Sequence, residues 1–181
     1  MRPRDLVLTL LLVAPISCFG ANNDQLREIM YADQADRQVE PGPDQWKDIS
    51  KRDAARRAKV QDELAAGRVQ TSADFYNAAL VMQHGDTLED IRMAHALATI
   101  AASLDPLDRS ARWLKAASWD RLLLRQKKPQ WYGTQYVRDT NGKWALYEVD
   151  ESAVTDADRI ELAAPTIAEA KKRVEVMNRA K

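Results

Sequence analysis

The chain has 181 residues, and its 27 lysines and arginines balance 27 aspartates and glutamates, so the formal net charge is zero. Without a basic surplus or an acidic tail, the sequence indicates neither a nucleic-acid-binding protein nor a disordered one. Only two histidines and one cysteine are present, and no HExxH spacing, P-loop or dinucleotide motif occurs. We therefore expect no metal and no cofactor, and no motif names a reaction.

The N-terminus has the three-part layout of an export signal. Two arginines precede a short apolar run over residues 6–16, and small residues follow up to Gly20. The run is too short to span a bilayer, so we expect a cleaved signal peptide over residues 1–20 and a periplasmic or secreted protein. The alternative is a lipoprotein modified at Cys18, the one case in which we expect contact with a membrane. Either way no cysteine pair remains, and the fold must be held by its own core.

Helical periodicity covers most of the chain after the signal. Pro41-Gly42-Pro43 and His84-Gly85 mark helix ends. Capping patterns mark helix starts, at Thr87 with Asp90 and again at Thr155. The expected helices cover, in chain order, residues 24–38, 44–66, 71 or 72 to 84, 87–104 and 108–126, followed by a short helix from 155 and a last one from 166.

A short β-hairpin is expected after these helices. The dipeptide Asn141-Gly142 lies between two short extended segments, which predicts a hairpin over residues 136–149. The third to fifth helices, with their short loops, look like stacked helical hairpins of the tetratricopeptide kind, although no repeat of that period is clear. The fold class expected is mainly α, an array of antiparallel helical hairpins with one small C-terminal β-hairpin. We take residues 21–43 as an N-terminal helix and linker, and residues 44–181 as a single helical domain.

Several polar side chains fall on the apolar faces of these helices. With about 100° of rotation per residue, Asp120 lies in the middle of the apolar face of the fifth helix, and Arg121 lies near its rim. Asp53 falls on the apolar stripe of the second helix, Gln83 faces inward from the third, and His84 lies at the edge of that face. A buried carboxylate must be paired, hydrogen-bonded or protonated, so Asp120 needs a partner from elsewhere in the fold. The apolar positions that define the two faces are Trp46, Ile49, Val60 and Leu64 in the second helix and Trp113, Ala116, Ala117, Leu123 and Leu124 in the fifth.

The segment Pro129-Gln130-Trp131-Tyr132-Gly133-Thr134-Gln135 interrupts the helical pattern. A proline stops the fifth helix, and the residues after it follow neither a helical nor an alternating period. In a structural interpretation, Asp120 accepts hydrogen bonds from backbone donors of residues 132–135 and locks this segment on the helix. In a binding interpretation, Arg121 pairs with an anion and the two glutamines recognise amide groups. In an enzymatic interpretation, Asp120 or His84 acts as a general base.

The candidate site is therefore a cluster of inward polar residues that converges on residues 130–135. A binding or interaction domain for a small polar ligand or a peptide end is the main hypothesis. A hydrolase and a purely structural helical scaffold are the alternatives. His95 lies on a narrow polar stripe and is expected to face solvent. The candidate catalytic residues are His84 and Asp120, and the candidate ligand-binding residues are Asp53, Gln83, Arg121, Gln130, Tyr132, Thr134 and Gln135.

The same residues carry a resemblance to a family. Gln83-His84, Asp120-Arg121 and Pro129-Gln130-x-Tyr132-Gly133-Thr134-Gln135 resemble the signature of an uncharacterised bacterial domain family, and Trp46, Asp53 and Arg159 fall at comparable places. The resemblance covers roughly residues 44–181. The chain departs from the pattern by lacking a Gly-Trp-Pro-like segment near residues 67–71 and by having Gly85 where an alanine is usual. The resemblance implies a shared site and brings no established activity.

Overall fold

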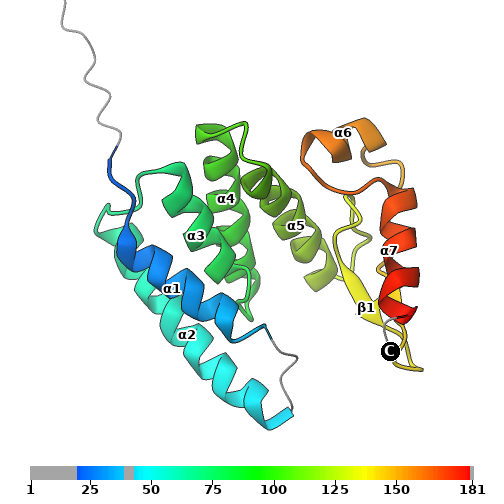
Figure 1. The fold of residues 1–181 in the computed structure, drawn as a ribbon, viewed down its shortest axis with the longest axis horizontal. Coiled ribbons are helices and arrows are strands. Elements are labelled where there is room, and N and C mark those ends of the chain that lie inside the picture. The colour runs from blue at the N-terminus through cyan, green and yellow to red at the C-terminus, as the bar shows by residue number, and fades with distance from the viewer. Residues whose placement is uncertain (1–19, 39–42, 180–181) are drawn as a thin grey trace, which may run out of the picture.

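The computed structural model of the protein describes residues 20–38 and 43–179, with side chains from residue 45 onward in the second range. Residues 1–19 of the expected signal peptide, Cys18 among them, and the helix break at Pro41-Gly42 lie outside the described residues. The described part of the chain forms seven helices and one two-stranded antiparallel sheet (Figure 1). The elements are α1 (Asp24–Ala35), α2 (Pro43–Ala65), α3 (Ser72–Met82), α4 (Leu88–Leu104), α5 (Arg109–Arg125), β1 (Tyr136–Arg138), β2 (Trp144–Leu146), α6 (Asp156–Glu161) and α7 (Ile167–Arg179).

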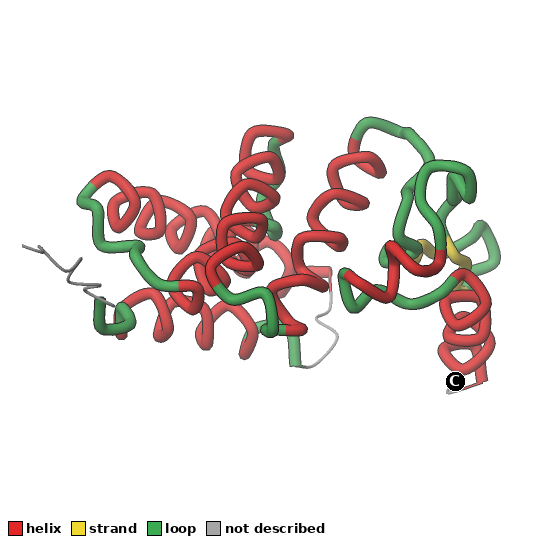
Figure 2. The backbone as a smooth tube through the Cα atoms, turned by 90° about the horizontal axis from the view of Figure 1, so that it is seen from above, coloured by secondary structure: helices red, strands yellow, loops and turns green. Residues whose placement is uncertain are grey.

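The first five helices form an array in which each helix packs on its neighbours in the chain. α4 lies between α3 and α5, and α3 also contacts α1 and α2. The hairpin, α6 and α7 lie at the end of the array away from α1 and α2, and α7 packs on β2 (Figure 1; Figure 2). This arrangement confirms the predicted fold class, mainly helical with one small C-terminal hairpin.

Short-range signals set the helix starts. Thr87 with Asp90 and Thr155 with Asp158 form capping boxes, in which the threonine hydroxyl and the aspartate carboxylate each accept from the other residue's backbone N–H. A third capping box at Thr71 settles which of the two expected residues caps α3. Each of these interactions spans only three residues, which explains why the sequence pattern was sufficient to predict them.

The main apolar core lies between α1, α2, α3 and α4 and includes one residue of α5. It is rich in alanine, which lets the helices approach closely, and each large side chain that is fully buried contributes about 1.5–3 kcal/mol. The buried members of the core are Leu26, Ile29, Val60, Val69, Ala78, Ala79, Leu80, Val81, Met82, Ala94, Leu97, Ala98 and Leu114.

Three predicted side-chain orientations are wrong. Trp46 and Trp113, expected on inward faces, are 46% and 37% exposed. Helical periodicity gives the direction of a side chain, but it does not say how far another element covers it. His95, expected to face solvent, is half-buried, with its ring centroid 5.2 Å from that of Trp119 and its Nδ1 3.2 Å from the Ser118 hydroxyl.

The predicted hairpin is present but shorter than expected. β1 and β2 pair in antiparallel register from Tyr136 opposite Leu146, and Gly142 in the turn has φ 73°, a left-handed conformation that suits glycine. The second strand ends at Leu146 because the chain then turns toward the loop after α5. There Val149 forms an isolated parallel bridge with Gln130.

Candidate functional site

The predicted cluster divides into two regions, and the first is centred on Asp120. Its fully buried carboxylate has four donors, the backbone N–H groups of Trp131 (2.8 Å), Tyr132 (3.0 Å) and Thr134 (3.0 Å) and the Thr134 hydroxyl (2.8 Å). Burial raises the pKa of Asp120, and the hydrogen bonds from these donors act in the opposite direction. The structural interpretation is therefore confirmed, because Asp120 holds the loop of residues 131–134 on α5.

The side-chain amide of Gln130 in the same loop is also fully engaged. Gln130 donates from Nε2 to the carbonyl oxygens of Tyr147 (2.9 Å) and Gln135 (3.0 Å), and its Oε1 accepts from the Gln135 N–H (2.8 Å). Buried Arg159 of α6 donates from Nε and Nη2 to the Trp131 carbonyl oxygen, at 3.1 and 2.8 Å. We call this set the loop clamp, and its members are Asp120, Gln130, Thr134, Gln135 and Arg159.

The loop clamp offers little to a ligand. Gln130 is fully buried and Gln135 is 9% exposed, and their side-chain groups already have partners within the protein. Tyr132 contributes its backbone N–H to Asp120. Within the described residues, no hydrogen bond or ion pair joins Asp120 to His84, so the acid–base pair of the enzymatic interpretation is not formed. The loop clamp acts on the fold.

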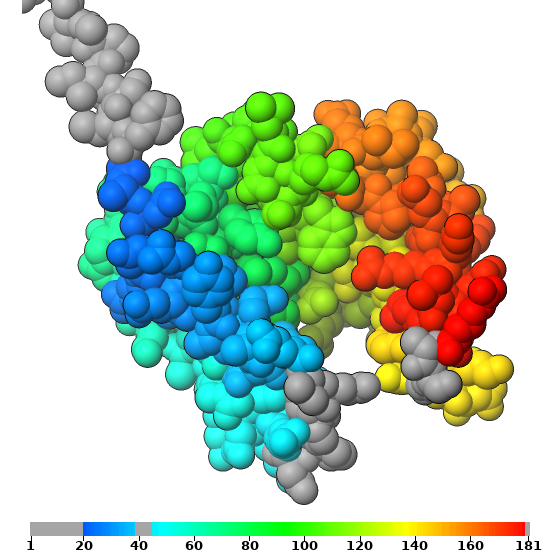
Figure 3. Space-filling view, viewed as in Figure 1, coloured from blue at the N-terminus to red at the C-terminus, as the bar shows by residue number. Residues whose placement is uncertain are grey.

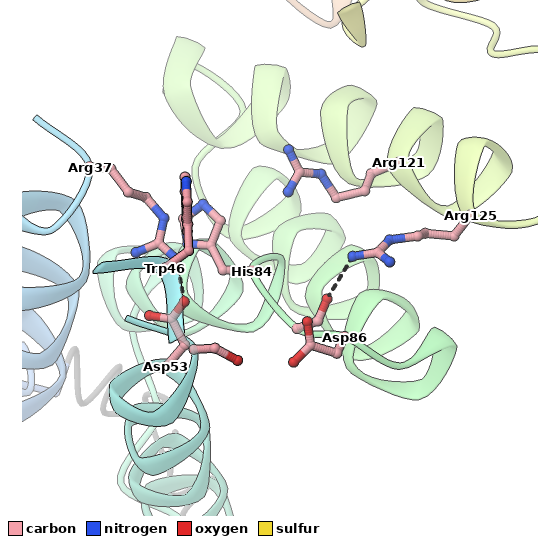
Figure 4. Close-up of a pocket in the computed structure, with 9 residues that line it drawn as sticks. Arg37, Trp46, Asp53, His84, Asp86, Arg121 and Arg125 are labelled. Atoms are coloured by element: carbon pink, nitrogen blue, oxygen red, sulfur yellow. Dashed lines mark hydrogen bonds and ion pairs between the residues drawn. The ribbon is translucent and has the colours of Figure 1, made fainter. Parts of the chain in front are cut away.

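The second region is a pocket of about 220 Å³ between the end of α1, the start of α2, the α3–α4 turn and the last turns of α5. Arg121, the residue after Asp120, lines it, and so do His84 and Asp53 (Figure 4). Gln83 is not among the lining residues, but its backbone carbonyl oxygen accepts a hydrogen bond from Arg121 Nη1 at 3.1 Å. We call this the arginine pocket, and its lining residues are Arg37, Trp46, Ser50, Asp53, His84, Gly85, Asp86, Arg121 and Arg125.

His84 is held by a partner from α1. Its Nδ1 lies 2.9 Å from Oδ2 of Asp33, whose side chain is completely buried. The same carboxylate accepts from Arg37 Nη1 (3.1 Å) and from Gln34 Nε2 (2.7 Å). Burial lowers the pKa of His84, although Asp33 works against that shift. The imidazole is therefore neutral near neutral pH, with its Nδ1 proton directed to Asp33.

Asp53 lies in the pocket wall, but its charge is matched. Its two oxygens pair with Arg37 Nη2 (2.5 Å) and Arg56 Nη1 (2.9 Å). Arg56 also pairs with Asp36 of the helix before it, which pairs in turn with Arg52. These ion pairs tie the end of α1 to the first half of α2, so Asp53 forms part of the frame of the pocket.

Arg121 and Arg125 differ from Arg37, the third arginine of the pocket, because neither has an acidic partner in the described part of the chain. Their guanidinium groups donate only to backbone carbonyl oxygens, Arg121 to Gln83 (3.1 Å) and Arg125 to Gly85 (3.4 Å). Burial and the positive charges of Arg125 and Arg37 lower the pKa of Arg121. Asp86 lines the same pocket, but its side chain is 70% exposed and lies 3.7 Å from Arg57. The pocket therefore carries unmatched positive charge.

Asp33, Arg37 and Arg125 of this region were not identified from the sequence. Asp33 lies four and seven positions after Ile29 and Leu26, both buried, so it continues the inward stripe of α1. Helical periodicity, which places Asp120 on an apolar face, places Asp33 on one as well. Arg37 carries no such signal, since its pairing with Asp53 joins different helices.

Comparisons of the chain with models of protein families, with curated proteins and with solved structures found no match. The resemblance to a bacterial domain family therefore stays a prediction. Among the described residues, no group of histidine, cysteine, aspartate and glutamate side chains could hold a metal ion. In the same ranges, 20–38 and 43–179, no helix has the length and apolar character needed to cross a membrane.

Proposed function

We propose that the protein is a binding domain whose arginine pocket holds a small anionic ligand. One observation supports this proposal above the others, namely that Arg121 and Arg125 face the pocket without an acidic partner in the described chain. The ligand expected from the sequence, a small polar molecule or a peptide end recognised by Arg121, is kept. We now expect this ligand to contact residues of the arginine pocket, and not Gln130, Thr134 and Gln135 as the sequence indicated. Export to the periplasm or beyond stays a prediction on which this proposal does not depend.

The positive charge of Arg121 is held partly away from water. A guanidinium group that is partly desolvated beside two other cations is destabilised, and an anion between them offsets that cost. Arginine presents donors in a planar fork that matches both oxygens of a carboxylate or two oxygens of a phosphate. A volume of about 220 Å³ is below the usual size of pockets for drug-sized molecules, so the group bound inside is small.

The proposal is tested by titrating the protein with acetate and with inorganic phosphate, followed by NMR chemical shifts. Saturable shifts of the Arg121 and His84 signals are expected for at least one anion. Arg121→Gln should weaken binding by about tenfold or more, since the charge-assisted hydrogen bonds are lost. The matched control is Arg92→Gln, which removes an exposed arginine paired with Glu89 on α4 and should leave binding unchanged. Equal affinity of Arg121→Gln and the native protein would refute the proposal.

A second candidate function, a hydrolase, is favoured by the pair of Asp33 and His84. An imidazole oriented by a buried carboxylate through Nδ1, at 2.9 Å, has the arrangement of a general base that accepts a proton at Nε2. This replaces the pairing of His84 with Asp120 that we expected from the sequence. The two functions are distinguished by incubating the protein with small esters and amides that carry a carboxylate. Turnover that disappears in His84→Asn supports the hydrolase, and binding without turnover supports the binding domain.

A further inference from the structure

Besides its charged groups, the arginine pocket contains a neutral hydrogen-bond acceptor, Nε2 of His84. The oxygens of Asp33 accept from Arg37 and Gln34, and they also lie 2.9 Å from Nδ1 of His84, so Nδ1 is assigned the proton that it donates to them. That proton fixes the tautomer and leaves Nε2 of His84 with a lone pair. The side chain of His84 is 14% exposed and lines the pocket. No described residue donates a hydrogen bond to Nε2.

The donors of the pocket approach from a different element. Arg121 and Arg125 extend from α5 toward the α3–α4 turn, where His84 and Gly85 lie (Figure 4). A ligand between them therefore meets two guanidinium groups on one side and an imidazole acceptor on another. Figure 3 shows the molecule hollowed between α1 and α7, with α5 at the back of the hollow.

A third group of the pocket is apolar. Trp46 of α2 is 46% exposed and lines the pocket. An indole that is left this open beside cations offers a flat surface to an apolar side chain. A ligand that uses all three groups needs a carboxylate, an N–H donor close to it and an apolar substituent.

We propose that the arginine pocket binds an N-acylated α-amino acid, which is the chemistry of a peptide C-terminus and of a free N-acyl amino acid. The inference rests on the proposed function and names its ligand class. The carboxylate lies against Arg121 and Arg125, the amide N–H donates to Nε2 of His84, and the side chain packs on Trp46. An anion without an N–H donor leaves Nε2 unpaired in a partly buried site, which weakens its binding.

The test uses three related compounds, titrated into the protein by calorimetry. N-acetyl-leucine has the carboxylate and the N–H group, N-acetyl-leucinamide lacks the carboxylate, and isocaproate lacks the acylated nitrogen. N-acetyl-leucine is expected to bind most tightly. Isocaproate should bind about three- to tenfold more weakly, the effect of one hydrogen bond, and the amide should not bind measurably.

The matched variant is His84→Asn. An asparagine amide can donate to Asp33 in place of Nδ1 but places no acceptor where Nε2 stands, and denaturant unfolding checks that the variant is folded. In His84→Asn the three- to tenfold preference for N-acetyl-leucine over isocaproate should disappear, about the effect of one hydrogen bond. A variant that still prefers N-acetyl-leucine, or one that weakens both acids equally, overturns the inference.

The outcomes also distinguish the anion pocket from its proposed ligand class, and a peptide C-terminus from a free N-acyl amino acid. If N-acetyl-leucine and isocaproate bind the native protein equally and both depend on Arg121, the ligand class is wrong and the anion pocket stands. If neither acid binds saturably, the ligand class is wrong, and the anion pocket fails as well if inorganic phosphate does not bind either. A leucine-ended tetrapeptide that binds as tightly as N-acetyl-leucine or more tightly, and loses binding when amidated, identifies a peptide end. A tetrapeptide that binds far more weakly identifies a free N-acyl amino acid.

Discussion

Asp120 and Arg121 are neighbours in α5, yet they belong to regions that treat charge in opposite ways. The carboxylate of Asp120 is completely buried and has four hydrogen-bond donors, all from one loop. The guanidinium group of Arg121 has one backbone carbonyl oxygen and lies near two further arginines. In the loop clamp the carboxylate of Asp120 is hydrogen-bonded within the protein. In the arginine pocket the guanidinium group of Arg121 has no acidic partner among the described residues.

Asp120 stabilises the fold, whereas Arg121 has a charge without an acidic partner in the described chain. Buried polar groups in folded proteins are almost always hydrogen-bonded, so a satisfied network needs no explanation beyond stability. An unmatched charge in a pocket costs stability, and proteins keep such groups mainly where function requires them. The two residues, adjacent in a sequence motif, therefore predict opposite effects of mutation.

The largest effect is expected for Asp120→Asn. The near-isosteric amide turns an N–H₂ group toward backbone donors and removes the charge that they stabilise, so the free energy of unfolding should fall by about 3–5 kcal/mol. Denaturant unfolding measures it. Asp48→Asn is the control, since Asp48 is 69% exposed and its change should stay within about 0.5 kcal/mol. A folded Asp120→Asn protein should keep its anion affinity, and a neutral effect on stability would mean that the loop clamp does not hold the loop.

Asp33→Asn is expected to have a smaller effect on stability and a second effect on the pocket. The change removes the buried partner of His84 and one partner of Arg37, and should lower the free energy of unfolding by about 2–3 kcal/mol. It also releases the tautomer of His84, so the preference for an N–H donor should disappear while Arg121 still binds anions. Calorimetry with N-acetyl-leucine and isocaproate measures this preference. If it persists, Asp33 does not orient the imidazole.

The effect of Arg121→Gln on stability should have the opposite sign or be absent. The substitution removes a half-buried cation beside Arg125 and Arg37 that has no acidic partner in the described chain, so the free energy of unfolding should stay the same or rise by at most about 1 kcal/mol. A thermal or denaturant melt is sufficient to detect it. A loss of several kcal/mol would place Arg121 with the structural residues and remove the contrast with Asp120.

Helical periodicity predicted where Asp120 and Arg121 point, but not what they meet. The pattern placed Asp120 in the middle of an apolar face and Arg121 at its rim, and the structure finds the first fully buried and the second half-buried. The sequence offered the loop after α5 as one interpretation for the donors of Asp120, but it gave no sign that Arg121 reaches the α3–α4 turn. Those contacts depend on how helices pack, which single-helix patterns do not contain.

The partner of His84 shows the same limit over a longer distance. Asp33 and His84 are 51 residues apart, and nothing local to either position indicates the other. By contrast, the capping boxes at Thr87 and Thr155 span three residues and were predicted correctly. The sequence therefore identified the candidate residues in and around α5, and the structure was needed to separate them into two regions.

The last effect depends on pH, and it concerns Glu63 of α2, which lies beside Asn23 at the start of α1. Its carboxylate accepts from Arg68 (2.7 and 2.8 Å) and from Asn23 Nδ2 (2.6 Å), which hold its pKa at about 2, below the ordinary value of 4.5. Because the folded pKa lies below the unfolded one, this carboxylate stabilises the fold above pH 4.5. That contribution is lost as the pH falls from 4.5 toward about 2.

Glu63→Gln should therefore lower the free energy of unfolding near neutral pH and make its decline from pH 4.5 toward pH 2 less steep than in the native protein. Gln130→Leu is the contrasting variant, because it removes an uncharged amide from the loop clamp and should lower stability by a similar amount at every pH. Urea unfolding across the acid range measures both. Only a titrating group can change how steeply the free energy of unfolding falls with pH. If that free energy falls equally steeply in Glu63→Gln and Gln130→Leu, the ion pair of Glu63 does not contribute to the acid sensitivity of the protein.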